Sequence, residues 1–243
     1  MTPVGRLILV RSIDKRLLVN AMSLVTIPAL VGPICGPPLG GFMFRLGIGA
    51  LPFLLPLLLQ IGFDLTPFQS GLITFTGALG SLFMKAAVAS VLRRFGYRPV
   101  LVYNSLISGA FLAACASFVP GMPFTAMIAI LLTGGFFRSL QFTAINTLAY
   151  AEIEPPLMSR ATTLVSVAQQ LALSTGVAVG ALVVEITLRL KHGSAMGAMD
   201  FPPAFLVIGA LSASAAFIFA RLSPDAGAEL AGRKMTQAAA DNP

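Results

Sequence analysis

Charged residues are scarce in this sequence. Asp, Glu, Lys and Arg make up 10% of its 243 residues, against roughly 25% in a typical soluble chain. So few charges cannot cover a water-facing surface. Lipid-facing helices can be built from such a chain, because hydrocarbon solvates Leu, Phe and Val directly. Apolar residues make up 56% of the sequence and the mean hydropathy is +0.88, so we expect an integral α-helical membrane protein.

Residues that hold metals or carry out catalysis are also few. Cys35 and Cys115 both lie in apolar runs without a CxxC or CxxH companion, so we predict neither a disulfide framework nor a zinc site. The single histidine, His192, lies in an expected loop. We find no nucleophile–base pair, HExxH or phosphate-binding loop. We therefore expect no enzyme and no cofactor or metal.

The net charge of +7 comes from Lys and Arg residues that are scattered along the chain. Nucleic-acid binding is not expected, because it requires a clustered basic surface. Most of these residues lie in short connecting segments, where positive charge marks the cytoplasmic side of a membrane protein.

Seven apolar runs are separated by polar segments. A helix needs about 20 apolar residues to cross a bilayer core some 30 Å thick, and each run approaches or exceeds that length. The runs predict an all-α polytopic membrane bundle with six to seven transmembrane helices: Leu17–Cys35, Leu39–Gly62, Pro67–Leu92, Pro99–Val119, Pro123–Tyr150, Ser159–Leu190 and Pro202–Ala220.

The basic segments predict an orientation in the inner (plasma) membrane. Arg93–Arg98, Ala151–Met158 and the tail after Arg221 are expected in the cytoplasm. Arg16 is also basic, but three runs separate it from Arg93, which breaks the alternation. Either the first two runs form a hairpin and one basic group lies outside, or the first run does not cross fully. We favour six crossings.

A glycine- and proline-rich stretch carries a family resemblance. Gly32-Pro-Ile-Cys-Gly36-Pro37-Pro38-Leu-Gly40-Gly41 resembles the antiporter motif of the major facilitator superfamily, which lies on the fifth helix of drug:proton antiporters. The GPxxGG ending is matched in full, whereas Ser23 replaces an earlier glycine of the pattern. Glycines four residues apart allow helices to approach closely, so a generic packing face is the alternative interpretation.

Three further stretches, 46–61, 134–154 and 158–181, resemble the last six helices of the fourteen-helix drug:proton antiporter-2 family. The resemblance implies that residues 1–41 are a remnant of the N-terminal half with the antiporter motif. Residues 42–221 would form the C-terminal six-helix transporter half, and 222–243 a loose cytoplasmic tail. Family helices 1 to 3, most of 4, and 6 to 8 have no counterpart, so the chain resembles an N-truncated, internally deleted member.

The resemblance implies proton-coupled export of drugs or other small amphipathic molecules. The expected partners are the lipid bilayer, a small-molecule substrate and protons. Members of this superfamily transport through two facing halves, so we expect this chain to be incomplete alone and to need a homodimer or a full-length transporter. The alternative is a non-transporting membrane fragment, or an accessory subunit that packs against a full-length exporter.

Arg138 is the most informative single residue, because it lies in the middle of an apolar run. A mid-bilayer Arg costs roughly 2.5–3.5 kcal/mol on insertion scales, so it should face partners or water. At 1.5 Å per residue, Arg138 lies roughly 18 Å from Tyr150, and Gln169 and Gln170 lie roughly 15 Å from Ser159. The shared depth makes these groups candidates for a substrate or proton pathway, and the full candidate set is Arg45, Arg138, Gln141, Asn146, Gln169 and Gln170.

A polar stripe supports the same region. Thr163, Ser166, Gln170 and Ser174 recur at helical spacing, so we expect them to face the bundle interior. An interhelical hydrogen-bond network is the alternative to a pathway. Glu185 lies near the outer end of its run, where we expect it to be solvated.

Overall fold

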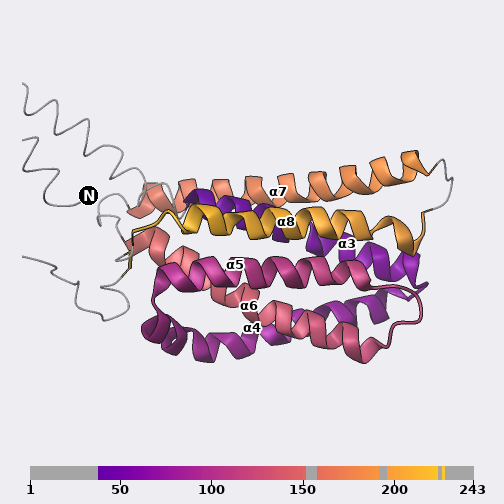
Figure 1. Cartoon of the computed structure of the whole chain (residues 1–243), viewed down its shortest axis with the longest axis horizontal. Helices are drawn as coiled ribbons and strands as arrows, with labels where there is room; N and C mark the ends of the chain where they lie inside the picture. The colour runs from indigo at the N-terminus through magenta and orange to yellow at the C-terminus, as the bar shows by residue number, and fades with distance from the viewer. Residues whose placement is uncertain (1–37, 152–157, 192–195, 224–225, 228–243) are drawn as a thin grey trace, which may run out of the picture.

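Six long helices run along one axis in the computed structural model, which describes residues 38–151, 158–191, 196–223 and 226–227 (Figure 1). Each is long and apolar enough to cross a membrane. Six of the seven predicted runs are confirmed as helical spans: Pro38–Gly62, Pro67–Phe95, Tyr97–Ser117, Phe124–Tyr150, Ala161–Leu190 and Ala198–Phe219.

Some predictions fall outside the described residues. The run Leu17–Cys35 and the motif residues Gly32, Gly36 and Pro37 are among them, and so is nearly all of the expected tail. The question of how the first run crosses therefore stays open. Residues 38–49 form one helix, so the expected seam between residues 41 and 42 lies within a helix.

The first span, Pro38–Gly62, changes helix type along its length. Residues 38–49 are α-helical, a turn at Ala50 leads into α3 (Leu51–Leu57), and a π-helical turn, η1 (Leu58–Gly62), ends the span. Pro52 begins α3 and Pro56 lies inside it. Proline removes a backbone donor and clashes with the preceding turn, which accounts for the irregular end of this span.

The other spans are α4 (Pro67–Phe95), α5 (Tyr97–Ala114) with the 3-10 turn η2 (Cys115–Ser117), α6 (Phe124–Ala151), α7 (Met158–Leu190), and α8 (Pro202–Phe219) preceded by η4 (Ala198–Asp200). The start of α4 is set by a capping box. The backbone N–H of Gln69 donates to Thr66 Oγ1 over 3.3 Å, and the backbone N–H of Thr66 donates to Gln69 Oε1 over 3.0 Å. Its end is set by Gly96, whose φ of 84° is a conformation that glycine adopts readily.

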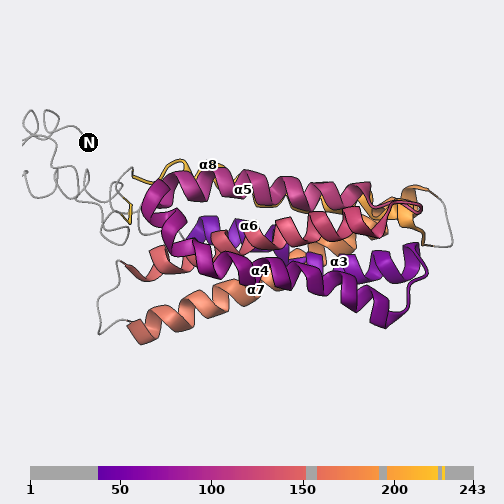
Figure 2. The ribbon, with the colours of Figure 1, turned by 90° about the horizontal axis from the view of Figure 1, so that it is seen from below.

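Successive helices alternate in direction, so the connections gather at two ends (Figures 1 and 2). The α4–α5 turn and the end of α8 lie at what we call the basic end, which carries Arg93, Arg94, Arg98 and Arg221. The opposite, far end carries every described carboxylate. There, Glu185 pairs with Arg189 and Asp200 pairs with Lys191, each over 2.5 Å. The third carboxylate is Asp64, which precedes α4.

Glycines bring pairs of helices into close contact. Gly77 and Gly80 of α4 pack against the backbone of α6 at Gly135 and Leu132, and a Cβ on Gly109 of α5 would lie 2.7 Å from the carbonyl oxygen of Gly209 in α8. Such contacts between small residues are a main source of helix association in lipid, where the hydrophobic effect is absent.

Two apolar clusters fill the bundle, one toward each end. The cluster toward the far end includes Leu54, Phe118 and Phe205, and the cluster toward the basic end includes Phe44, Tyr97 and Phe219. Between them along the helices lies a group of buried or half-buried polar side chains, which we call the polar layer: Arg45, Asn104, Ser105, Ser108, Arg138, Gln141 and Ser212.

Candidate functional site

Gln141 anchors the part of the polar layer that joins α5 to α6. It is fully buried. Its Nε2 donates to Ser105 Oγ over 2.7 Å and to the Leu101 carbonyl over 3.1 Å. Its Oε1 accepts from Asn104 Nδ2 over 2.9 Å, and Asn104 also donates to the Phe137 carbonyl over 2.8 Å. This arrangement matches the interhelical-network alternative for Gln141, because its amide groups are used within the protein.

Arg138 lies three residues before Gln141, but its side chain lies in different surroundings. Its side chain is half-buried and lines two cavities. No described residue forms a hydrogen bond or ion pair with it. A membrane-embedded Arg needs either a partner or a cavity, and the Arg138 side chain lines cavities. No hydrogen bond joins Arg138 to Gln169 or Gln170, the two glutamines expected at the same depth.

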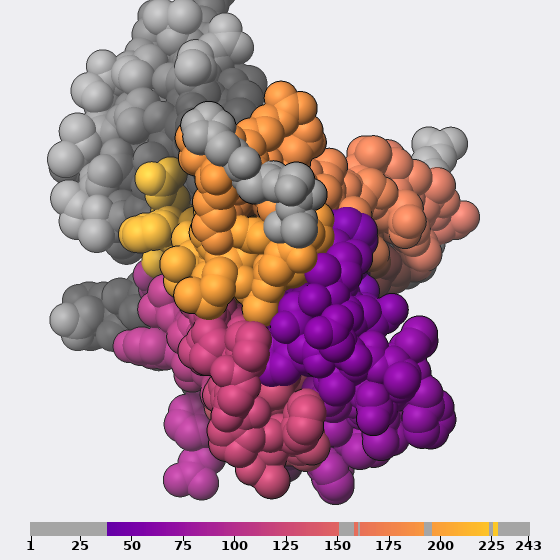
Figure 3. Space-filling model, turned by 90° about the vertical axis from the view of Figure 1, so that its right-hand side faces the viewer, coloured from indigo at the N-terminus to yellow at the C-terminus, as the bar shows by residue number. Residues whose placement is uncertain are grey.

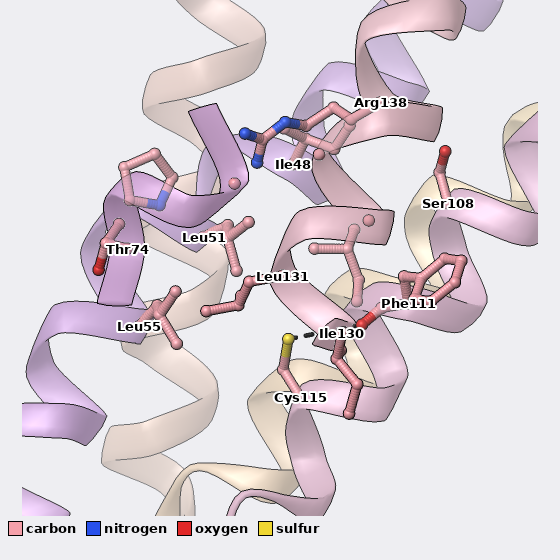
Figure 4. A pocket seen from close by; sticks show the side chains of 15 residues that line it. Ile48, Leu51, Leu55, Thr74, Ser108, Phe111, Cys115, Ile130, Leu131 and Arg138 are labelled. Carbon is pink, nitrogen blue, oxygen red and sulfur yellow. Dashed lines mark hydrogen bonds between the residues drawn. The ribbon is translucent and has the colours of Figure 1, made fainter. Parts of the chain in front are cut away.

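The first of these cavities has a volume of about 100 Å³ and lies among the first span, α4, α5 and α6. Figure 4 shows the Arg138 guanidinium beside Ile48, with Leu51, Leu131 and Cys115 lining the space toward the far end. Its walls are mostly apolar. Cys115 is buried and its Sγ donates to the Phe111 carbonyl over 3.4 Å, in keeping with a small core residue.

The second cavity is larger, with a volume of about 270 Å³, and four helices contribute to it. Three cationic side chains reach its wall, each from a different helix: Arg45 of the first span, Lys85 of α4 and Arg138 of α6. We call this space the cationic cavity. Its other lining residues are Phe44, Ile48, Ser81, Ser139, Phe142 and Leu173.

Arg45 is held in this wall by an aromatic ring. The centre of its guanidinium lies 4.4 Å from the centroid of the Phe142 ring, a cation–π contact worth about 0.5–2 kcal/mol. Its Nη2 is buried without a hydrogen-bond partner. One of its donor groups is therefore unused in the described structure, and an unsatisfied buried donor costs about 1–3 kcal/mol or more.

Asn146 and Gln169 lie nearer the basic end. Gln169 Nε2 of α7 donates to Asn146 Oδ1 of α6 over 2.9 Å. Both residues line a small cavity of about 30 Å³ that Arg45 also borders. The predicted candidates Arg45, Asn146 and Gln169 are thus brought together, and Arg138 joins Arg45 at the neighbouring cationic cavity.

The sequence predicts that Gln170 and the rest of the polar stripe of α7 face the bundle interior. This prediction is wrong. The side chains of Thr163, Ser166, Gln170 and Ser174 are all exposed. Figures 2 and 3 show why: the first half of α7, in salmon, stands apart at the side of the bundle. Helical periodicity places these residues on one face of α7 but does not say which way that face points.

Two glycines of the antiporter-like motif, Gly40 and Gly41, lie among the described residues. Gly40 lies against the ring of Phe219, and a Cβ on Gly41 would lie 2.8 Å from Ile145 Cγ2. Both glycines therefore serve close packing here. Glu185 is exposed and pairs with Arg189, as expected for a solvated carboxylate near a helix end.

The sequence reasoning missed Asn104 and the position of Lys85 beside the two arginines. An asparagine in the middle of an apolar run is a usable signal for Asn104, because buried amides require partners. Lys85 lies within α4, ten residues before the helix ends at Phe95.

Comparisons with known proteins give a consistent result. A family model, the Major Facilitator Superfamily, matches residues 39–240. Similar curated proteins are named "Putative multidrug resistance protein MdtD". The one from Pectobacterium atrosepticum is 34% identical over 189 residues, which cover 76% of this chain and 40% of that protein. The one from Escherichia coli is 35% identical over 193 residues, with the same coverage of 76% and 40%. The matched part thus spans about two fifths of each relative.

Proposed function

Because the chain belongs to the Major Facilitator Superfamily, we propose that it takes part in proton-coupled export of drugs or other small amphipathic molecules. Transporters of this superfamily rock two helical halves about a site between them. In this proposal, residues 42–221 form one such half. The opposing wall comes from a second copy of this chain or from a full-length transporter.

The cationic cavity is the observation that carries this proposal. It lies where the first span, α4, α6 and α7 meet, and it combines aromatic and aliphatic walls with three cations. Ligand sites combine mainly apolar walls with a few placed polar groups. Intramembrane cations that lack partners are costly and mark substrate or ion pathways. The cavity thus has the composition expected of a surface that handles amphipathic molecules.

Proton coupling requires a group that binds and releases a proton within the membrane. The three described carboxylates, Asp64, Glu185 and Asp200, all lie at the far end. We therefore propose that the proton-binding group belongs to the opposing wall, and that the described helices supply the substrate-facing side.

The charges of the two ends support a cytoplasmic basic end in the inner membrane. Four arginines whose side chains the structure describes lie at the basic end, which has no described carboxylate. The far end carries three carboxylates, Asp64, Glu185 and Asp200, and two cations, Arg189 and Lys191. The basic end thus has four described Lys or Arg side chains, and the far end has two. An excess of Lys and Arg residues marks the cytoplasmic side, and acidic residues contribute little to this bias.

An accessory role is a second candidate, and the exposed stripe of α7 favours it. Polar side chains on an outer helix face suit packing against another membrane protein. In that case the chain would bind a full-length exporter through α7 without forming a substrate path of its own.

Reconstitution tests the transport proposal. The full chain is isolated together with any bound partner, separated by mass into assembled and monomeric fractions, and placed in proteoliposomes with a proton gradient. Efflux of ethidium, a cationic dye, and carboxyfluorescein, an anionic dye, is then measured.

We expect gradient-dependent efflux from the assembled fraction, reduced at least tenfold by Arg138→Gln, and none from the monomer. Efflux from a homogeneous monomer would contradict the need for a second wall. Partner-driven efflux that is unchanged by Arg138→Gln would favour the accessory role.

A further inference from the structure

We propose that the cationic cavity binds the anionic group of an amphipathic organic anion. The inference deepens the proposed function and rests on it for its biological meaning, because it names the class of molecule that this wall would handle. Arg45, Lys85 and Arg138 come from three different helices and line one space. Like charges gathered in a region of low dielectric repel one another strongly, and a bound anion would offset that repulsion.

No described carboxylate lies close enough to neutralise these cations. Leu173 lines the cavity, and Glu185 lies twelve residues further along α7, about 18 Å away at 1.5 Å per residue. Asp64 follows the end of the first span, and Asp200 is already paired with Lys191 over 2.5 Å. The charge of the cavity is therefore uncompensated within the described chain.

Two of the cations that line this space carry guanidinium groups, which suit an oxyanion. Arg45 lines it, and the centre of its guanidinium lies 4.4 Å from the Phe142 ring centroid. Its Nη2 is buried and has no hydrogen-bond partner among the described residues. Arg138 likewise makes no hydrogen bond with any described residue. A guanidinium presents its N–H groups as a rigid fork that matches a carboxylate or phosphate. Lys85 adds a third positive charge.

The rest of the wall suits an apolar body. Phe44, Ile48, Phe142 and Leu173 border the same space. At about 270 Å³ the cavity approaches the size of the smaller ligand sites, about 300 Å³. An anionic group joined to an apolar body can come from a free organic carboxylate or from an anionic lipid, and the experiment separates these sources.

Binding is measured by isothermal titration of the full chain in nanodiscs of zwitterionic phosphatidylcholine. The probe is 2-naphthoate, and its uncharged counterpart is 2-naphthamide, which has the same rings. We expect 2-naphthoate to bind at least tenfold more tightly than 2-naphthamide. Lys85→Gln and Arg45→Gln should each weaken 2-naphthoate about tenfold. Arg93→Gln is the matched control: it removes a cation from the same helix as Lys85, but at the basic end, and it should change affinity less than twofold.

Lys85 is exposed, so Lys85→Gln keeps the packing of the bundle even if Arg45→Gln does not. A second set of nanodiscs contains phosphatidylglycerol. If that lipid weakens 2-naphthoate tenfold, the anion that the cavity takes is a lipid headgroup; if it does not, the site takes a free carboxylate. Equal affinity for the acid and the amide, or no effect of Lys85→Gln, would overturn the proposal. Intact binding without dye efflux would reject only the transport function.

Discussion

Gln141 shows how the polar layer stabilises the bundle. Its amide makes three hydrogen bonds to α5 within the protein interior. The neighbouring groups keep other partners when Gln141 is lost, because Asn104 still donates to the Phe137 carbonyl and Ser105 to the Leu101 carbonyl. Hydrogen bonds between membrane helices contribute about 0.6 kcal/mol on average and up to about 2 kcal/mol.

We therefore expect Gln141→Leu to lower the free energy of unfolding by about 1–2 kcal/mol. Titration of the purified chain with a denaturing detergent, followed by circular dichroism, measures the change. Gln170→Leu is the matched control, because Gln170 is exposed and makes no hydrogen bond with a described residue. Equal losses for the two variants would show that the buried network adds no stability.

The depth of Arg138 was predictable from its place in an apolar run, but its neighbours were not. Sequence spacing fixes the distance along a helix, whereas the rotation of one helix against another depends on packing. Gln169 and Gln170 share a depth, yet Gln169 bonds to Asn146 and Gln170 is exposed. The same limit applies to Lys85, whose position beside Arg45 and Arg138 depends on how α4 packs against α6 and the first span.

At the scale of the element, the spans were predicted closely and their ends less so. The start of α4 at Pro67 agrees with its predicted run, because Thr66, Pro67 and Gln69 form a recognisable helix start. Its end was placed at Leu92, whereas the helix continues to Phe95. Arg93 and Arg94 occupy its last turn, where positive charge is favourable near the helix C-terminus.

The packing of α4 against α6 depends on small residues at a few positions. A Cβ added at Gly80 would meet the carbonyl oxygen of Leu132, a backbone atom that cannot rotate away, whereas one at Gly71 would meet no atom within 4 Å. Both glycines lie on α4. We expect Gly80→Ala to destabilise the chain by about 1–3 kcal/mol through overpacking.

Gly71→Ala should be neutral or slightly stabilising, because alanine is more favourable than glycine in a helix interior by about 1 kcal/mol. The same detergent titration compares the two variants. If Gly80→Ala unfolds at the same detergent fraction as Gly71→Ala, the close approach of α4 and α6 does not limit stability.

At the scale of the whole molecule, the alternation of six helices separates a basic end from a far end with three carboxylates. We expect Phe95→Cys, exposed at the basic end, to react with an impermeant thiol reagent only after the cells are opened. Thr125→Cys, exposed near the start of α6, should react in intact cells. Both variants are made in a chain with Cys35→Ser and Cys115→Ala. The reverse pattern would place the basic end outside.

The exposed face of α7 raises the question of what covers it in a membrane. Thr163 and Ser166 satisfy their hydroxyl groups by donating to carbonyls four residues earlier, over 3.1 Å and 2.8 Å. Gln170 forms no such bond with a described residue. An amide left unpaired in hydrocarbon costs several kcal/mol, roughly 4–8 on scales that lack hydrogen bonding. Contact with a second protein surface would remove most of that cost.

We therefore expect two copies of the chain to meet through this face. In the same cysteine-free chain, Gln170→Cys should form a cross-linked species of about 2 × 25.3 = 50.6 kDa when an oxidant is added to membranes. Leu106→Cys on α5 is the control, because Leu106 is also exposed but lies on a different helix from the polar stripe. Electrophoresis without reductant measures both products. Equal cross-linking at the two positions would indicate random collisions, and no product from Gln170→Cys would exclude a symmetric contact at this residue.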